Sequence, residues 1–391
     1  MKHLKKLSAL LLALVMVLSC VGNAFAAEEA SALSGKTEIA ENGGFKDIQS
    51  KKSPEVLKGF RSEIFMKENG YVYADDETVR AIVILEGMPE SEAGEAGSKK
   101  AADQKVKLLN QHNTVRKAMS GIDYVLQYEY TAVLNGFSCD VAYGDLDAIA
   151  MIDGVEAVYI ANRYAEPVLT VNTDTKMSVS NQMTGASYAF DEEFCGGGIV
   201  IAVLDTGIRT THAAFADGGD LCADYAVLDE SAKEKVATPG TYVSAKIPFA
   251  YDYADKDADA TDHNGHGTHV AGIAAGWDGE YLEEEGGYAA DFIGAAPGAQ
   301  LLAMKIFSDK GGGTSSDVYY QAIEDAYVLG ADIISMSIGA QNGFTYDSSL
   351  ETEVFGNIYQ RMEDAGVVMS VAAGNEYSMA YYSSMGYIGM E

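Results

Sequence analysis

The chain has 391 residues, of which 48% are hydrophobic and 22% charged, a composition typical of globular proteins. This length gives room for roughly two to three domains. Its 58 acidic residues outnumber the 27 basic ones, so the formal net charge at pH 7 is -31. Such an excess of negative charge disfavours binding to nucleic acid and to anionic membranes. It suits a secreted, highly soluble protein, or one that holds cations.

Residues 1–26 have the pattern of a secretory signal peptide. A lysine-containing start is followed by an apolar run over residues 9–18 and by Ala24-Phe25-Ala26, which has the small-x-small pattern of a cleavage site. The apolar run is too short to span a membrane. We therefore expect secretion without membrane insertion, and a lipoprotein signal at Cys20 is the less favoured alternative. Attachment to the cell wall through a C-terminal region outside these 391 residues is left open.

Three cysteines follow the signal, at positions 139, 195 and 222. An odd and sparse set does not form a disulfide framework, although a bridge between Cys195 and Cys222 is left open. No Cys-x-x-Cys or histidine-rich spacing indicates zinc.

Residues 27–77 are polar and read as a leader, and residues 78–166 as a small domain. Hydrophobic alternation in the second segment predicts strands at residues 81–85, 124–134, 137–142 and 155–160, with helices at 99–120 and 146–152. Asn135-Gly136 is a turn signal between two of the strands. The order strand-helix-strand-strand-helix-strand is that of a ferredoxin-like α+β unit.

After a linker at residues 167–183, residues 184–391 alternate between strands and helices. Apolar strands of the buried parallel kind are expected at residues 198–204, 301–306, 332–336 and 367–371, with helices at 314–329 and 350–365. Thr314 and Ser315 are the expected caps of the first helix. This pattern predicts an α/β fold with a doubly wound, mostly parallel sheet. Functional groups should then lie at the carboxyl ends of its strands.

Three polar residues occur where such strand ends or tight turns are expected. Asp205 directly follows a predicted strand, His266 stands in the glycine-rich run His263-Asn264-Gly265-His266-Gly267-Thr268-His269, and Asn375 ends Ala372-Ala373-Gly374-Asn375. Taken alone, each is more often a helix cap or a polar turn residue. Together, in this order and on one α/β frame, they are far more specific.

These segments resemble the aspartate, histidine and oxyanion motifs of subtilisin-like serine peptidases, over a region from about Thr184 to the end of the chain. Residues 78–166 are similar to the inhibitory propeptide of that family. The acidic run at residues 251–257 further resembles the lactocepin-like cell-envelope peptidases of Gram-positive bacteria.

The resemblance implies a serine endopeptidase that needs no cofactor for its chemistry. His266 would be the general base, Asp205 would orient its ring, and the Asn375 amide would donate to the oxyanion. In such enzymes two backbone segments flank an extended polypeptide substrate, and here they are Gly311, Gly312 and Gly313, and Ser337, Ile338 and Gly339. The propeptide would be an intramolecular inhibitor, with residues 162–167 in the cleft.

The glycines at 311–313 would let a peptide backbone approach closely. An ordinary flexible loop is the serious alternative for this stretch. A phosphate loop is disfavoured, because no Gly-Lys-Ser/Thr follows.

The nucleophile motif of the family, Gly-Thr-Ser-Met-Ala, is not found in the 391 residues. Ser384 lies too close to Asn375 to open the required helix. We therefore expect the serine beyond Glu391, in a longer precursor of which this sequence is the N-terminal part, and we expect the chain by itself to be inactive. A non-catalytic exported relative that acts as a binding or scaffold protein is the alternative, and a calcium-dependent adhesion module is a weaker third.

Two acidic clusters raise the question of structural calcium, since oxygen-rich loops suit that ion. They comprise Asp252, Asp255, Asp257, Asp259 and Asp262 in the first, and Asp278, Glu280, Glu283, Glu284 and Glu285 in the second. Neither matches an EF-hand loop, and solvated acidic loops are the favoured interpretation.

Overall fold

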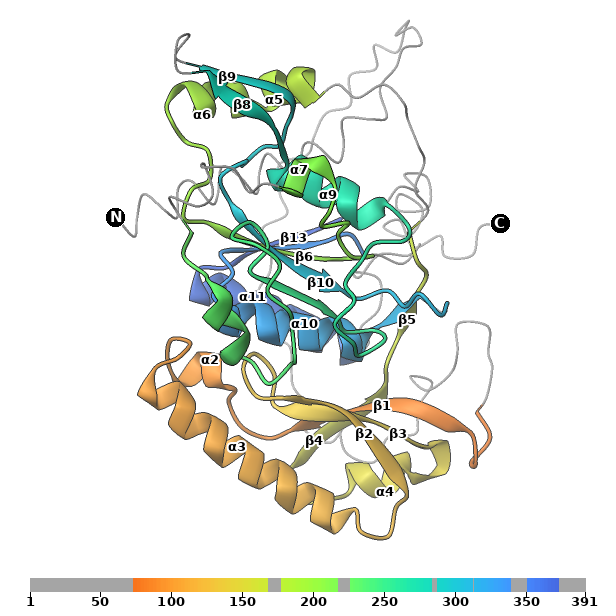
Figure 1. Cartoon of the computed structure of the whole chain (residues 1–391). Coiled ribbons are helices and arrows are strands. Elements are labelled where there is room, and N and C mark those ends of the chain that lie inside the picture. Colours follow the sequence, from red (N-terminus) through yellow and green to blue (C-terminus); the bar gives the residue numbers. More distant parts are fainter. Residues whose placement is uncertain are drawn as a thin grey trace, which may run out of the picture.

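The computed structural model describes residues 73–167, 177–216, 226–282, 287–311, 313–338 and 350–372. The predicted signal peptide and nearly all of the leader lie outside these residues, as do Cys222, Gly312, Gly339, Asn375 and Ser384. Cys195 is a free thiol. The described residues form two units, each built on a sheet (Figure 1).

The first unit is a four-stranded antiparallel sheet in the order β2-β3-β1-β4. Its strands are β1 (Thr78–Leu85), β2 (Tyr124–Tyr130), β3 (Gly136–Ala142) and β4 (Val155–Ile160). The long helix α3 (Lys99–Ala118) and the short α4 (Leu146–Ala150) lie on the same side of this sheet (Figure 1). Strand order and helix placement are those expected of the strand-helix-strand-strand-helix-strand pattern. Short elements complete the unit: α2 (Glu90–Ala93) and the 3-10 turn η3 (Tyr143–Asp145).

The strand predicted over residues 124–134 ends early, at Tyr130. Beyond it, the backbone N–H groups of residues 131–134 donate to the carboxylate of Glu324 in the second unit. The chain therefore leaves the sheet because a tertiary acceptor replaces the neighbouring strand. At Gly136 the chain re-enters the sheet beside β1. A Cβ at this position would lie only 2.2 Å from the Val83 carbonyl oxygen, so the close approach requires glycine.

The second unit is a five-stranded sheet in the order β13-β12-β6-β10-β7, parallel throughout. Its strands are β6 (Val200–Asp205), β7 (Phe249–Asp252), β10 (Gln300–Lys305), β12 (Ile333–Met336) and β13 (Val368–Val371). Helices α10 (Ser316–Leu329) and α11 (Leu350–Ala365) cover one face, and α9 (His266–Ala275) and α7 (Ala213–Ala216) the other (Figure 1). The α/β fold with a doubly wound parallel sheet is thus confirmed.

Alternation along β6 explains why this strand is apolar throughout. Val200, Ala202 and Leu204 belong to one hydrophobic cluster, while Ile201 and Val203 belong to the other. Successive side chains of a strand point to opposite faces, so a sheet with helices on both sides buries all of them. The first of these clusters continues into the first unit, so the two units share a core.

Several elements were not predicted from the sequence. They are α5 (Met177–Thr184), α6 (Ala186–Asp191), the 3-10 turn η4 (Glu230–Glu234), β7, and the hairpin of β8 (Trp277–Leu282) with β9 (Gly287–Ile293). Helix α10 begins at Ser316, two residues after the predicted start, and Ser315, one of the two expected caps, is at its N-cap position. Thr314 and Ser315 form the short strand β11, which pairs antiparallel with β5 (Arg163–Tyr164) of the chain that leaves the first unit. Within the described part of the chain, none of the helices combines the length and the apolar character that a membrane-spanning helix requires.

Candidate active site

Asp205 and His266 lie in direct contact at the carboxyl edge of the parallel sheet. Asp205 is the last residue of β6 and His266 is the first residue of α9. The His266 Nδ1 atom is 2.8 Å from Asp205 Oδ1. The Asp205 side chain is 1% exposed and that of His266 is 21% exposed. The fold therefore brings together two residues that are 61 positions apart in the sequence.

Two glycines allow the start of α9 to approach the end of β6 so closely. A Cβ on Gly267 would lie 2.2 Å from the Gly207 carbonyl oxygen and 3.1 Å from the Asp205 Cβ. Gly207 itself has a φ of +110°, and a Cβ there would lie 2.5 Å from the Ala260 carbonyl oxygen. Larger residues would push the helix, and with it His266, away from Asp205.

The charges around His266 favour its protonated form. Burial alone would lower the pKa of His266, but the hydrogen bond to Asp205 and the charges of Asp205 and Asp262 outweigh burial and raise this pKa. Burial and the neighbouring His266 lower the pKa of His269, one turn further along α9. With Nδ1 directed at a buried carboxylate, Nε2 is the ring nitrogen left to exchange a proton with a substrate or a nucleophile.

The end of the first unit runs along this site. The Ser316 N–H donates to the Asn162 carbonyl at 3.0 Å, and β5 then pairs with β11. Beyond β5, Glu166 Oε1 and the Pro167 carbonyl both accept from Asn264 Nδ2, each at 3.0 Å. Asn264 is two positions before His266, so residues 162–167 extend from β11 to the loop that carries the histidine.

Gly313 lies against the backbone of this segment. Its φ is +73°, and a Cβ there would lie 1.9 Å from the Tyr164 carbonyl oxygen. Gly311 also has a positive φ, +84°, but a Cβ on it would meet nothing within 4 Å. Replacing either glycine by another residue would therefore strain the backbone, but only a side chain at Gly313 would also collide with β5.

Replacing Gly313 by alanine is expected to displace β5 from β11. The exposed Arg163 should then be cut by added trypsin at least about tenfold faster, a factor that corresponds to roughly 1.4 kcal/mol. Gly311→Ala is the matched control, since it adds similar backbone strain without the contact. Equal cleavage rates for the two variants would show that the approach of Tyr164 does not depend on Gly313.

The other predicted substrate-binding residues stand at the same edge of the sheet. Ser337 and Ile338 directly follow β12, which lies beside β6. Ile338 is 2% exposed and belongs to the core, so its side chain does not line a surface. Gly312, Gly339 and Asn375 fall outside the described residues.

Ser315 completes a Gly-Thr-Ser run at residues 313–315, but its surroundings are not those of a nucleophile. Its hydroxyl donates to Asp317 Oδ1 at 2.5 Å, and the residue pairs with Arg163 in β11. The Ser315 hydroxyl is therefore hydrogen-bonded to a carboxylate and not to an imidazole.

The first acidic cluster is divided by the structure. Oxygens of Asp252, Asp255 and Asp309 lie within 4.8 Å of one another. The buried Lys305 ammonium pairs with Asp252 at 3.4 Å and also with Asp309. Burial raises the pKa of Asp252 to about 6. Lys310 pairs with Asp255 at 3.4 Å. Two lysines of this chain thus already pair with the three carboxylates, which makes the set a poor fit to calcium.

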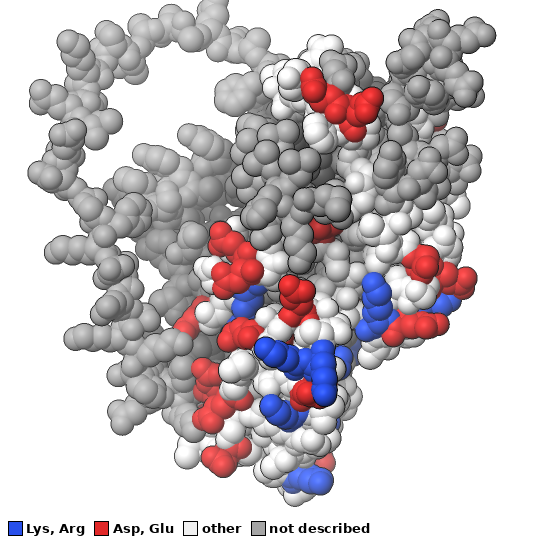
Figure 2. All heavy atoms as spheres, turned by 90° about the vertical axis from the view of Figure 1, so that its left-hand side faces the viewer, with Lys and Arg blue, Asp and Glu red and all other residues white. Residues whose placement is uncertain are grey.

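Asp262 is not part of this group, because its carboxylate faces Thr206 and Thr268. In the second cluster, the side chains of Glu280 and of residues 283–285 lie outside the described part of the chain. Among the described residues on the face shown in Figure 2, acidic and basic side chains are interspersed.

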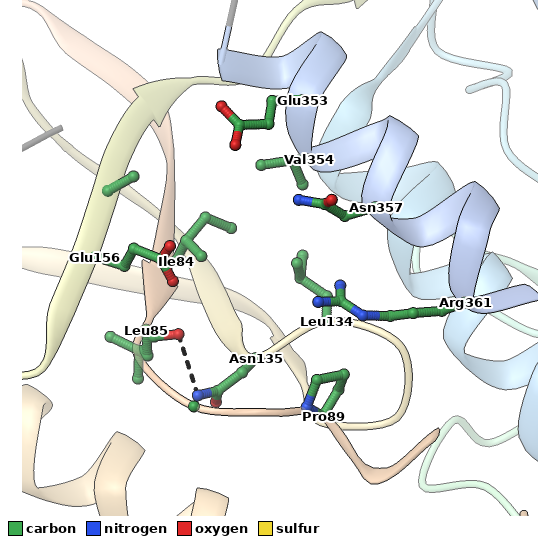
Figure 3. Close-up of a pocket in the computed structure, with 12 residues that line it drawn as sticks. Ile84, Leu85, Pro89, Leu134, Asn135, Glu156, Glu353, Val354, Asn357 and Arg361 are labelled. Atoms are coloured by element: carbon green, nitrogen blue, oxygen red, sulfur yellow. Dashed lines mark hydrogen bonds between the residues drawn. The ribbon is translucent and has the colours of Figure 1, made fainter. Parts of the chain in front are cut away.

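A cavity of about 180 Å³ lies between the two units (Figure 3), and neither Asp205 nor His266 lines it. One wall comes from β1 and β4, with Ile84 and Glu156, and the other from α11, with Glu353, Asn357 and Arg361 (Figure 3). Arg361 donates to Glu92 and to the Val133 carbonyl of the first unit. The cavity therefore belongs to the junction of the units.

Sequence reasoning missed the part that Asn264, Thr206 and Asp262 play around the histidine. Asp262 was interpreted only as a member of an acidic cluster. A signal was nevertheless present, because Asp262 and Asn264 stand just before the expected helix, and side chains of these two types often accept from N–H groups at a helix start.

Comparisons with known proteins find a matching family model and similar proteases. Residues 196–388 match the model of the subtilase family. The chain is 30% identical over 317 residues to the PII-type proteinase of Lacticaseibacillus paracasei, covering 78% of this chain and 16% of that protein. It is 34% identical over 186 residues to the C5a peptidase of Streptococcus pyogenes serotype M6, covering 47% of this chain and 15% of that protein.

A crystal structure of the epidermin leader peptide processing serine protease from Staphylococcus aureus matches 76% of this chain and 61% of that chain, with a TM-score of 0.46 and 15% identity. The chain thus spans about one sixth of the length of the two curated relatives named above.

Proposed function

The chain belongs to the subtilase family, and on that basis we propose that it is the N-terminal part of a secreted serine endopeptidase precursor. The observation that carries the proposal is the 2.8 Å contact between His266 Nδ1 and the buried Asp205 carboxylate at the carboxyl edge of the parallel sheet. This is the arrangement of a general base and its orienting acid. The nucleophilic serine is expected in a segment beyond residue 391.

In the proposed reaction, the serine oxygen attacks the scissile carbonyl while His266 Nε2 takes its proton. His266 then returns the proton to the leaving amine, and water releases the acyl group by the same route. Asp205 holds the ring tautomer and stabilises the imidazolium. Asn375 is proposed to donate its side-chain amide to the oxyanion.

The substrate is proposed to be an extended polypeptide. The pairing of β5 with β11 supports this, because it shows that this edge accepts an added antiparallel strand beside Gly313. We also propose that residues 78–166 are an intramolecular inhibitor, since residues 162–167 occupy the path between β11 and the histidine loop. The chemistry itself is proposed to need no cofactor.

The test begins with the coding DNA beyond codon 391. An in-frame extension that contains a Gly-Thr-Ser-Met-Ala motif should be expressed with the present chain and treated with a fluorophosphonate probe. The proposal expects one labelled serine, in that motif, and expects the amino terminus of the secreted protein to lie beyond residue 26. A stop codon directly after residue 391, or an extended protein that the probe does not label, would support a non-catalytic binding or scaffold protein instead.

A further inference from the structure

Asp262 is a fully buried carboxylate that precedes His266 by four positions. Its Oδ1 accepts from Thr206 Oγ1 at 2.9 Å and from the N–H groups of Asn264 and Gly265 at 3.0 and 2.7 Å. Its Oδ2 accepts from the N–H and the hydroxyl of Thr268, at 2.8 and 2.5 Å. Five donors therefore converge on this one side chain.

Three of these donors are backbone N–H groups, those of Asn264 and Gly265 just before α9 and that of Thr268 in its first turn. The first N–H groups of a helix have no partner within the helix and need an outside acceptor. Gly265, the residue at the N-cap position, has no side chain to supply one. Asp262 supplies it from three positions earlier, so the first turn of α9, which carries His266, is fastened to this carboxylate.

Asp262 also connects α9 to β6. Thr206, which directly follows Asp205, donates its hydroxyl to Asp262 and accepts from the N–H of Gly267 at 2.9 Å. Gly267 directly follows His266. The residues next to both members of the Asp205–His266 pair are thus held by one hydrogen-bonded group with Asp262 at its centre.

The charged groups around His266 come from four parts of the chain. Asp205 belongs to β6, Asp262 to the loop before α9, His269 to α9 itself, and Glu166 to the segment held by Asn264. Burial would raise the pKa of Asp262, but its hydrogen bonds outweigh burial and lower this pKa, so the group is ionised at neutral pH. Asp262 thereby acts on His266 through charge as well as through geometry.

We propose that Asp262 is a positioning residue, which holds His266 in register with Asp205 through the Thr206 and Gly267 contacts and supports the imidazolium with a second negative charge. The inference rests on the proposed function only for its consequence in catalysis. Its structural content can be tested in the 391-residue chain, without the serine.

The test is a nuclear magnetic resonance titration of the chain labelled at its histidines, with His266 assigned by a His266→Gln variant. Asp262→Asn should lower the titration midpoint of His266, because a negative charge that favours the imidazolium is lost. The downfield signal of the Nδ1 proton shared with Asp205 should weaken. Asp259→Asn, the same substitution at an exposed site of the same loop, is the control and should shift the midpoint less. A midpoint and an Nδ1 signal that are the same in both variants would overturn the proposal.

Asp262→Asn could fail to fold, and two further variants cover that outcome. Thr206→Val leaves the Asp262 charge in place but removes the connection to Gly267, so it should weaken the Nδ1 signal while the midpoint moves little. Asp262→Glu keeps the charge. Relative to Asp262→Asn, it should restore the titration midpoint of His266 more fully than the signal of the Nδ1 proton. If the Nδ1 signal stays at its wild-type strength in Thr206→Val, the positioning role is wrong.

In the serine-containing protein, Asp262→Asn should move the acid limb of the pH profile of kcat/KM to lower pH, since the base then titrates lower. A purely structural role would reduce the amount of active enzyme without moving this limb. If the wild-type extended protein takes no fluorophosphonate label, the proposed function fails, while the titration still decides the role of Asp262.

Discussion

Replacing His266 by alanine is expected to reduce the turnover of the serine-containing protein on the order of 10⁶-fold. This magnitude comes from subtilisin, a member of the same family, and not from this chain. The physical reason is that the serine hydroxyl is a weak nucleophile unless a base removes its proton. His266 is the residue whose Nδ1 is fixed by a buried carboxylate, which leaves Nε2 for that task.

Asp205→Asn should retain the shape of the site and yet reduce turnover on the order of 10⁴-fold, because an amide in place of the carboxylate favours the wrong histidine tautomer. Both variants should be compared by rates of fluorophosphonate labelling and peptide hydrolysis. His263→Ala is the matched control, since His263 is exposed and only three positions from His266. Labelling of His266→Ala at the wild-type rate would refute the role given to this residue.

Replacing Glu324 by glutamine is expected to loosen the junction of the two units. The Glu324 side chain accepts from four consecutive N–H groups, those of residues 131–134, at 2.6 to 2.8 Å. Glutamine puts an NH₂ group in place of one of the two accepting oxygens, so about two buried N–H groups lose their acceptor. At pH 5 this should cost about 2–4 kcal/mol of unfolding free energy.

Urea unfolding measures that loss, and limited proteolysis at residues 131–134 should report the same opening. Glu363→Gln is the control, because Glu363 is exposed on the neighbouring helix α11. A Glu324→Gln variant as stable as this control at pH 5 would show that the four hydrogen bonds do not hold the units together.

The same residue predicts how stability depends on pH. Burial raises the pKa of Glu324 to about 7, although its four hydrogen bonds oppose this. A carboxyl with a raised pKa binds its proton more tightly in the folded state than in the unfolded state. Its contribution to the free energy of unfolding is therefore complete below about pH 4.5 and is lost as the pH rises through 7. For Glu324 the loss is about 3 kcal/mol.

Two other carboxyls act in the same direction. Burial raises the pKa values of Asp325 and Asp252 to about 6. The wild-type chain should therefore be more stable near pH 5 than near pH 8. The difference in unfolding free energy between wild type and Glu324→Gln should become smaller from pH 5 to pH 8, because the variant lacks the titrating group. A gap that widens from pH 5 to pH 8 would contradict the raised pKa of Glu324.

Much of the architecture could be predicted because it depends on local patterns. Continuous apolar runs such as residues 199–204 indicate strands buried on both faces, and the glycines around His266 indicate a tight turn into a helix. The candidates Asp205 and His266 were recognisable because short motifs surround them. Strand β7 was missed, since four residues carry too little periodicity to separate a strand from a loop.

The sequence by itself thus indicated most strands and helices of the two main sheets and the candidates Asp205 and His266, because neighbouring residues dictate periodicity and turn geometry. The tertiary structure decided which distant groups satisfy one another. Glu324 meets N–H groups 190 to 193 residues away, and β5 reaches β11 across the junction of the units. Asp262 was interpreted as one member of a solvated acidic cluster, and the structure makes it the acceptor that anchors α9. A buried carboxylate must find donors wherever the folded chain places them, and that placement depends on chain closure over distances that no local pattern encodes.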